Sequence, residues 1–281
     1  MVNTGSGGQT VTQGGGAAVN DSAPVITGSS TENTVTINAE KDQTASVTLS
    51  GANIDVSGKG KAAVSTTGEG NVSIELDGEN TLKSATNHAG LEKNNGGSLT
   101  IADEDKNGKL TAEGGIYGAG IGGGYEGEGS NIAITGGEVE ATGGIGGAGI
   151  GGGKNGAGSS IAITGGEVKA TGGKYGAGVG GGLSGNGNHI TITGGEVKAT
   201  GGLNGAGIGG GLWGKGKDIT ISGDAQLKVQ GGVGDYFDGP GAGIGDGGSR
   251  PKESTGGNPI PGAEVEPDTS DLLTTGWIEY Y

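Results

Sequence analysis

The sequence predicts an all-β fold, a right-handed parallel β-helix with three-strand rungs of about 29 residues. The first observation is a repeat, because the segment GAGIGGG or GAGVGGG returns every 29 residues, centred on Ile121, Ile150, Val179 and Ile208. The second is alternation inside each copy, where Ile161 and Ile163 face one side and Thr164 the other. A unit this short cannot bury its apolar side alone, so the copies must stack. A left-handed hexapeptide helix would need a multiple of six residues, which 29 is not.

Each copy contains three short strands joined by glycine corners. In the copy that begins at Gly149 these are GIGGG, IAIT and EVKAT, and the GG pairs between them suit the positive φ angles of sharp bends. Rungs stacked at the interstrand spacing of about 4.8 Å place each inward side chain over its equivalent. We therefore expect interior ladders of isoleucine, valine and alanine, namely Ile132, Ile161, Ile190 and Ile219; Ile134, Ile163, Ile192 and Ile221; Val139, Val168 and Val197; and Ala119, Ala148, Ala177 and Ala206.

Composition alone would suggest disorder, because only 30% of the residues are hydrophobic, 3% are aromatic and the net charge is −15. The repeat overrides that impression, since a β-helix core is one or two side chains wide. The acidic balance argues against nucleic acid as a partner. The chain has no cysteine and no apolar run long enough to span a membrane, so we expect neither disulfides nor membrane insertion. We also expect the protein to be a monomer.

Three regions follow from the pattern. We expect a flexible Gly/Ser/Thr-rich leader over residues 1–32, a parallel β-helix of eight or nine rungs over 33–247, and an acidic Pro/Gly linker with a C-terminal segment over 248–281. The last rung is longer than the others and contains Phe237, the only phenylalanine, which suggests an end cap. The closing LLTTGWIEYY is apolar enough to fold back on the solenoid or to begin a further domain.

The candidate binding surface is the GAGIGGG strip. Its outward residues are all glycine, so we expect a flat face without side chains, and the residues at its two edges are where the copies differ. A stacked row of exposed apolar and aromatic side chains marks a possible interaction surface, although the same side chains could merely shield backbone. The residues expected to bind a ligand are Tyr117, Tyr125, Tyr175, Leu183, Leu203, Leu212 and Trp213.

Catalytic and metal signals are weak. The outward column Glu138, Glu167 and Glu196 offers a possible calcium site, but it also suits a solvated face with lysine partners, so we expect no cofactor. The two histidines, His88 and His189, are far apart in the chain, and no carboxylate pair interrupts the repeat. We expect a protein that is not an enzyme.

The strings GAGIGGG, xIxITGGEVKATGG and VSIELDGENTLKS resemble repeat regions of large surface proteins of gut Firmicutes, over about residues 33–247. Those proteins are often labelled carbohydrate-binding, and they are similar to a clostridial family of lyase-like β-helices that bind acidic polysaccharide with calcium. Some surface proteins of gut commensals capture host immunoglobulin. No binding residue of either group matches a position here, so none is carried over.

The resemblance implies an extracellular, cell-wall-attached bacterial protein whose export signal and anchor lie outside this sequence. Together with the strip, it favours a non-catalytic adhesion module that binds a host protein such as immunoglobulin, or a glycan. A structural stalk and a polysaccharide-lyase-like enzyme are the alternatives.

Overall fold

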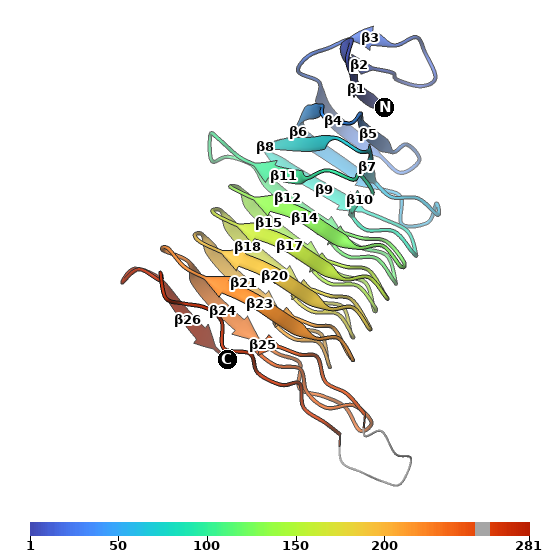
Figure 1. Ribbon diagram of the computed structural model, residues 1–281. Coiled ribbons are helices and arrows are strands. Elements are labelled where there is room, and N and C mark those ends of the chain that lie inside the picture. The colour runs from blue at the N-terminus through green and yellow to red at the C-terminus, as the bar shows by residue number, and fades with distance from the viewer. Residues whose placement is uncertain (251–258) are drawn as a thin grey trace.

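The computed structural model describes residues 1–250 and 259–281, which form strands and turns but no helix. The strands make an 11-stranded sheet, here called sheet A, and a 15-stranded sheet B. Figure 1 shows them piled in one column, from the N-terminal strands at the top to β26 at the bottom. Successive copies pair in parallel throughout the regular section, so the predicted all-β parallel solenoid is confirmed. No described segment is a helix long and apolar enough to cross a bilayer.

In the regular section each rung contributes one strand to sheet A and two to sheet B. The first regular rung has β13 (Ile121–Gly122) in sheet A, followed by β14 (Gly129–Ile134) and β15 (Glu138–Thr142) in sheet B. The next three rungs are β16 (Ile150–Gly151), β17 (Gly158–Ile163) and β18 (Glu167–Thr171); β19 (Val179–Gly180), β20 (Gly187–Ile192) and β21 (Glu196–Thr200); and β22 (Ile208–Gly209), β23 (Gly216–Ile221) and β24 (Gln226–Gln230).

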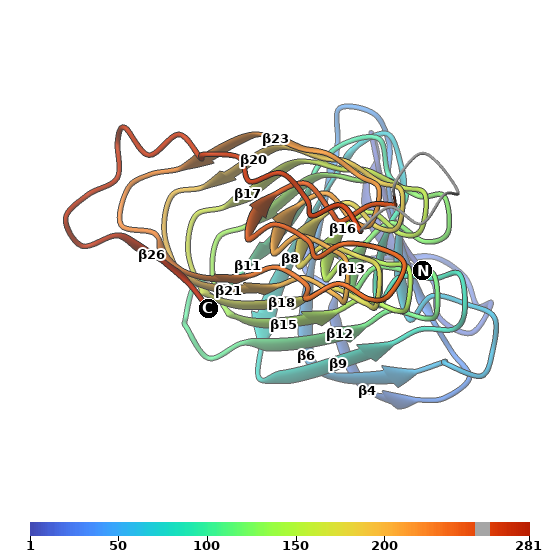
Figure 2. The ribbon, with the colours of Figure 1, turned by 90° about the horizontal axis from the view of Figure 1, so that it is seen from below.

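The two rows of sheet B enclose sheet A. Figure 2 looks along the stack and shows β17, β20 and β23 on one side, β15, β18 and β21 on the other, and β13 and β16 between them. We call the row with β17 arm 1 and the row with β18 arm 2. A glycine with positive φ, such as Gly166 at 85°, makes the corner between the arms in each regular rung.

The N-terminal rungs keep this arrangement with different residues. Their strands are β5 (Val35–Ala39), β7 (Val64–Gly68) and β10 (Leu91–Lys93) in sheet A, β8 (Asn71–Asp77) and β11 (Leu99–Ala102) in arm 1, and β9 (Glu79–Lys83) and β12 (Lys109–Glu113) in arm 2. The arms merge in β6 (Thr44–Asp55), whose first half pairs with β8 and second half with β9. The described stack thus has seven complete rungs rather than eight or nine, with β25 (Ile244–Gly245) as one more strand of sheet A.

The core consists of the ladders that the repeat predicts. In arm 1, Ile132, Ile161 and Ile190 pair in consecutive strands, and each is at most 1% exposed. In arm 2, Val139 pairs with Val168 in the same way. Burial of one such side chain contributes about 1.5–3 kcal/mol. Because each rung adds the same few aliphatic side chains, a chain with a low fraction of hydrophobic residues still buries a continuous core.

Close backbone approach between rungs explains the glycines of sheet A. Gly151 has a φ of 134°, and a Cβ there would lie 2.0 Å from the carbonyl oxygen of Gly180 in the next rung. The amide of Gly152 donates to that same carbonyl oxygen at 2.9 Å. The equivalent Gly122 and Gly209 have φ angles of 133° and 130° and meet the next rung in the same way. No residue with a side chain fits these positions.

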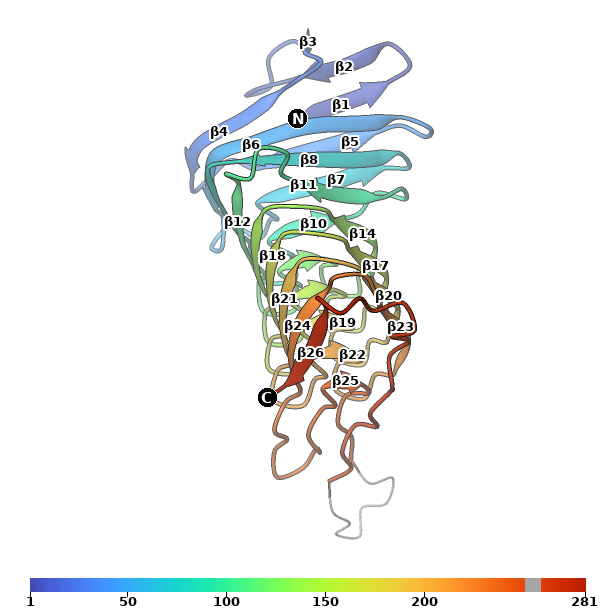
Figure 3. The same ribbon diagram turned by 90° about the vertical axis from the view of Figure 1, so that its left-hand side faces the viewer.

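The N-terminal residues are part of the fold. Instead of the flexible leader expected over residues 1–32, the chain forms β1 (Val2–Gly5), β2 (Gly8–Val11), β3 (Val19–Asn20) and β4 (Val25–Ser30). β1 pairs in parallel with β5, and β4 pairs in parallel with β6, so these strands cover the first rung, as Figure 3 shows. Composition did not reveal these strands, because a capping strand needs apolar residues on one side only and its other residues are polar. Val2, for example, faces the core and is 2% exposed.

The C-terminal segment folds back over the last rung. β26 (Trp277–Tyr280) pairs in parallel with β24, which selects the fold-back alternative for LLTTGWIEYY. The Glu264 carboxylate accepts the amides of Gly243 (2.8 Å) and Ile244 (3.2 Å) at the edge of β25. Residues 259–271, predicted as linker, join the C-terminal segment in this cap, while 251–258 of the predicted linker lie outside the described residues.

Replacing Gly151 with alanine tests the close approach. The new methyl group would meet backbone from the next rung, and the positive φ adds strain, so we expect the free energy of unfolding to fall by about 3 kcal/mol or more in urea denaturation. Gly58→Ala is the matched control, because a Cβ at Gly58 meets nothing within 4 Å. Equal midpoints for the two variants would contradict this packing.

Candidate binding surface at the loop corner

The glycine strip is not an exposed face, so this part of the sequence prediction is wrong. Every residue of the segment 147–153 is buried, as are those of 118–124, 176–182 and 205–211. The chain on either side folds against the strip: Ala148 donates its amide to Gly152, and a Cβ on Gly152 would lie 2.0 Å from Gly156. Because sheet A runs between the arms and under these loops, its glycines provide room for backbone and no surface for a ligand.

The two predicted edges of the strip meet at one corner of the solenoid. The amide of Lys154 donates to the carbonyl of Tyr117 (2.8 Å), and the amide of Leu212 donates to that of Tyr175 (2.8 Å), which joins the loop before the strip to the loop after it. In Figure 1 these loops project together at the right of the stack. We call this surface the loop corner, and it carries Ile116, Tyr117, Tyr125, Ile145, Lys154, Lys174, Tyr175, Leu183, Leu203, Trp213 and Val233.

Six of the seven predicted binding residues have at least part of their surface on this corner. Trp213 and Tyr125 are 48% and 43% exposed. Four are half-buried, namely Tyr117, Tyr175, Leu183 and Leu203. Leu212 is 2% exposed, so its prediction as a contact residue is wrong. Its neighbour Trp213 has a φ of 66°, and at this bend the indole turns outward and the leucine inward.

The N-terminal half of the loop corner holds an aromatic cluster. The rings of Tyr117 and Tyr125 lie 5.7 Å apart at 49°. The ammonium group of Lys154, from the next rung, lies 4.6 Å from the centre of the Tyr117 ring and 5.7 Å from that of Tyr125. Cation–π contacts of this kind hold three mobile side chains in one arrangement. The adjacent Glu126 side chain raises the pKa of the Tyr125 phenol.

A column of aliphatic side chains runs beside these rings. Ile116 is 44% exposed, Ile145 is 48% exposed and Val233 is 76% exposed, with Leu203 half-buried between the last two. Each follows the GG pair that closes arm 2, so each stands about 4.8 Å along the stack from the next equivalent. Lys174 replaces the aliphatic residue in the middle rung. Exposed aliphatic residues in such a row, interrupted once by Lys174, are unusual on a protein surface that has no partner.

The C-terminal half of the loop corner contains an open pocket of about 460 Å³. The loop between β24 and β25, which is six residues longer than its equivalents, forms one wall, and Trp213 and Tyr175 contribute to the opposite wall. Its lining residues are Lys174, Tyr175, Leu183, Leu212, Trp213, Asp235, Tyr236, Phe237, Asp238 and Arg250. We call this the corner pocket.

Tyr236 and Phe237 do not cap the core, contrary to the sequence prediction. They are 88% and 62% exposed, and their rings make an edge-to-face pair with centres 5.2 Å apart. The loop that carries them turns away from the stack because Asp235 accepts the amides of Phe237 and Asp238. These hydrogen bonds lower the pKa of the Asp235 carboxyl. The actual cap is the C-terminal segment that ends in β26.

A buried carboxylate fixes the loop against the corner. Asp238 is 2% exposed and accepts hydrogen bonds from the Arg250 guanidinium (3.0 and 3.2 Å) and from Nε1 of Trp213 (3.1 Å). The side-chain amide of Asn204 donates to the carbonyls of Asp238 and Gly239. A buried charge needs partners, and the carboxylate finds them in Arg250 and Trp213, while Asn204 holds the backbone beside it. The sequence gives no signal for this arrangement, because the partners are as much as 46 residues apart.

Acidic side chains converge at a different place from the predicted glutamate column. Glu138 and Glu140 of that region pair with Lys109 and Lys169, which supports the solvated face. In the described chain, Glu75, Asp103 and Asp105 place one carboxylate oxygen each within 4.8 Å of one another. Asp103 already accepts the amides of residues 107 and 108, so these bonds close the turn 103–108. Only one oxygen of each carboxylate converges, which is three of the 6–8 oxygens that calcium usually takes.

The rung of β10 has a polar cluster that the sequence analysis missed. Four side chains stand where later rungs have glycine, namely His88, Glu92, Lys93 and Asn94. Nδ1 of His88 lies 2.8 Å from the Glu92 carboxylate, which also accepts the side-chain amide of Asn94. Lys93 is 6% exposed and donates only to the carbonyl of Asn95. Aligning HAGLEKN under GAGIGGG at an offset of 30 residues would have revealed these departures.

Lys93→Met should raise the free energy of unfolding at pH 7 by about 1 kcal/mol, because burial lowers the pKa of the Lys93 ammonium. The unfolded chain then binds more protons than the folded chain as pH rises toward about 10.4, so the wild type gains stability in that range. The difference in the free energy of unfolding between the methionine variant and the wild type should therefore become smaller as the pH approaches 10. Chemical denaturation from pH 7 to 10 measures both, and a constant difference would contradict the assignment.

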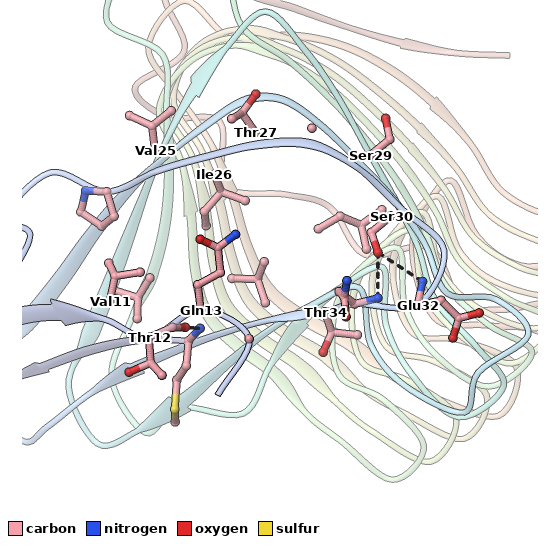
Figure 4. Close-up of a pocket in the computed structure, with 18 of the residues that line it drawn as sticks. Val11, Thr12, Gln13, Val25, Ile26, Thr27, Ser29, Ser30, Glu32 and Thr34 are labelled. Atoms are coloured by element: carbon pink, nitrogen blue, oxygen red, sulfur yellow. Dashed lines mark hydrogen bonds between the residues drawn. The ribbon is translucent and has the colours of Figure 1, made fainter. Parts of the chain in front are cut away.

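A further pocket, of about 830 Å³, lies at the N-terminal end and not at the loop corner. Figure 4 shows that its walls come from the segments around Val11, Ile26 and Thr34, with the hydroxyl of Ser30 turned to the amides of residues 32 and 33. Its lining contains aliphatic and hydroxyl side chains but no aromatic ring. Because the first rung ends there, the pocket is the gap between the core and the strands that cap it.

The family model described as "Beta helix repeat" matches residues 106–125, 132–154, 161–183 and 190–212. This section is a β-helix repeat region. The match covers less than half of the chain, so it identifies the repeat but not the role of the whole protein. No curated protein and no solved structure shows a significant match.

Proposed function

We propose that this chain is a non-catalytic binding module of an extracellular, cell-wall-attached bacterial protein, and that it engages a host macromolecule through the loop corner. One observation carries the proposal. Apolar and aromatic side chains that differ from copy to copy lie together on this corner, whereas the variable positions on arm 1 (Asn131, Ser160, His189 and Asp218) are polar and the core and the buried glycines are nearly identical from rung to rung. Such a distribution is expected if the stack is a scaffold and the corner meets the partner.

The chemistry of the corner supports a role in binding. Ile145 and Val233 expose aliphatic surface, and Trp213 and Tyr125 provide the large, rigid side chains that dominate binding energy at interfaces. Contacts within the corner, such as Lys154 over Tyr117, restrict these side chains before a partner arrives. Less conformational entropy is then lost on association.

Two partner classes suit this surface. The aliphatic column favours a host protein, of which immunoglobulin is a concrete candidate, because aliphatic side chains bury well against another protein surface. The aromatic side chains favour a glycan, because sugars stack on rings. A rigid spacer without a ligand and a lyase-like enzyme are the competing functions, and both leave the exposure of the corner unexplained.

Alanine variants of Trp213 and Tyr125 test the proposal. Biolayer interferometry would measure the binding of the chain to immobilised immunoglobulin and to defined glycans. For whichever probe binds, we expect each variant to weaken affinity at least tenfold, because each removes a half-exposed ring from the contact surface.

Glu167→Ala is the matched control, since Glu167 is exposed on arm 2, away from the corner, and should leave affinity unchanged. Full binding by both ring variants to a verified ligand would exclude this surface. Release of unsaturated products from uronic-acid polymers would instead support the enzyme.

A further inference from the structure

We propose that the corner pocket binds one unit of a neutral saccharide. This inference rests on the proposed function, since it names the ligand class of part of the same surface. The pocket volume of about 460 Å³ lies within the range of about 300–1,000 Å³ found for small-ligand sites. It is the one part of the described loop corner where an inserted loop turns a ridge into a concave site.

The walls suit the apolar faces of a sugar ring. Trp213 and Tyr175 contribute rings from neighbouring rungs, and Tyr236 and Phe237 contribute rings from the inserted loop. Aromatic faces carry partial negative charge and attract the weakly positive C–H groups of a pyranose. Arg250 lies over the Trp213 ring at 5.7 Å and over that of Phe237 at 5.6 Å, and the Lys174 ammonium lies over the Tyr175 ring at 4.8 Å. These cations tie the walls together, and a sugar would stack on Tyr236 and on the opposite faces of the other rings.

The polar groups of the pocket match hydroxyl groups and leave no net charge. Lys174 and Asp235 face the pocket with opposite charges and provide a donor and an acceptor. Arg250 and Asp238 pair with each other, so their charges cancel. A uronic acid or another anion would meet the Lys174 ammonium, which Asp235 opposes, and the Arg250 guanidinium, whose charge Asp238 already balances. This charge balance favours a neutral sugar over an acidic one.

The pocket is held in shape before any ligand binds. The Asp238 carboxylate links the inserted loop to Trp213 and Arg250, and the side-chain amide of Asn204 donates to the backbone carbonyl of Asp238 in the same loop. Because Nε1 of Trp213 already donates to Asp238, the indole is fixed by its edge while 48% of the residue remains exposed. A preorganised aromatic wall increases affinity for a weak ligand.

A glycan array of neutral, N-acetylated and uronic-acid oligosaccharides tests the inference with the full chain. We expect binding to neutral members, confirmed by calorimetry with the strongest of them. Tyr236→Ala should weaken that binding at least tenfold, and the variant should fold normally because Tyr236 is 88% exposed. Glu167→Ala, on arm 2 and outside both the loop corner and the pocket, is the matched control and should change affinity less than twofold.

The outcomes separate this inference from the proposed function. Preference for uronic acids, or equal binding by wild type and Tyr236→Ala, overturns the saccharide pocket. If no glycan binds but immunoglobulin does, and Ile145→Ala weakens that binding, the pocket inference is wrong and the corner still functions as proposed. If no probe is affected by either variant or by Trp213→Ala, both are wrong.

Discussion

The structure depends on backbone contact between glycines of consecutive rungs. In sheet A, the amide of Gly152 donates to the carbonyl of Gly180 at 2.9 Å, and the amide of Gly181 donates to that of Gly209 at the same distance. Side chains are excluded because a Cβ at Gly151 or Gly180 would lie 2.0 Å from the next carbonyl oxygen. This requirement recurs in every regular rung, which explains why the glycine segment is the least variable part of the repeat.

The close contact also determines where variation is possible. Backbone fills sheet A, and ladders such as Ile132 to Ile219 fill the inner side of the arms, so only the outward positions of the arms and the loops beside the strip are free to change. These loops emerge at one corner, because hydrogen bonds such as Lys154 to Tyr117 join the loops before and after the strip. The stack therefore provides rigidity, and the corner provides a surface whose chemistry differs from rung to rung. An inserted loop in the last rung adds a concave site with aromatic walls to the described corner.

The sequence was sufficient to predict most of the scaffold. Alternation in IAIT and EVKAT gave the two arms, and the 29-residue spacing gave the ladders, because both depend on periodicity alone. The burial of the glycine strip was not predictable in this way. A glycine that faces outward in a strand pattern suggests an open surface, while the same glycine packed under a loop has an identical pattern. Leu212 and Trp213 show the same limit, since adjacent apolar residues at a loop carry no signal of which one turns inward.

The sequence pattern also could not predict which residues far apart in the chain form hydrogen bonds with one another. Asp238, Arg250 and Asn204 meet through an insertion that has no counterpart in the other rungs, so the repeat gives no register for them. The strands that cap each end are short and polar on one side, which made residues 1–32 resemble a linker. Each of these features departs from the repeat, and periodicity informs only about positions that follow it.

Disulfide trapping at the loop corner tests the stacking most directly, and the absence of native cysteine makes the result unambiguous. Cysteines in place of Ile116 and Ile145 would lie on adjacent rungs, within the span of about 4.4–6.8 Å between Cα atoms that a disulfide bridges. We expect rapid intrachain oxidation of this pair and none when cysteines replace Ile116 and Lys174, which are two rungs apart. Oxidation of the distant pair in preference to the adjacent one would contradict the direct superposition of copies.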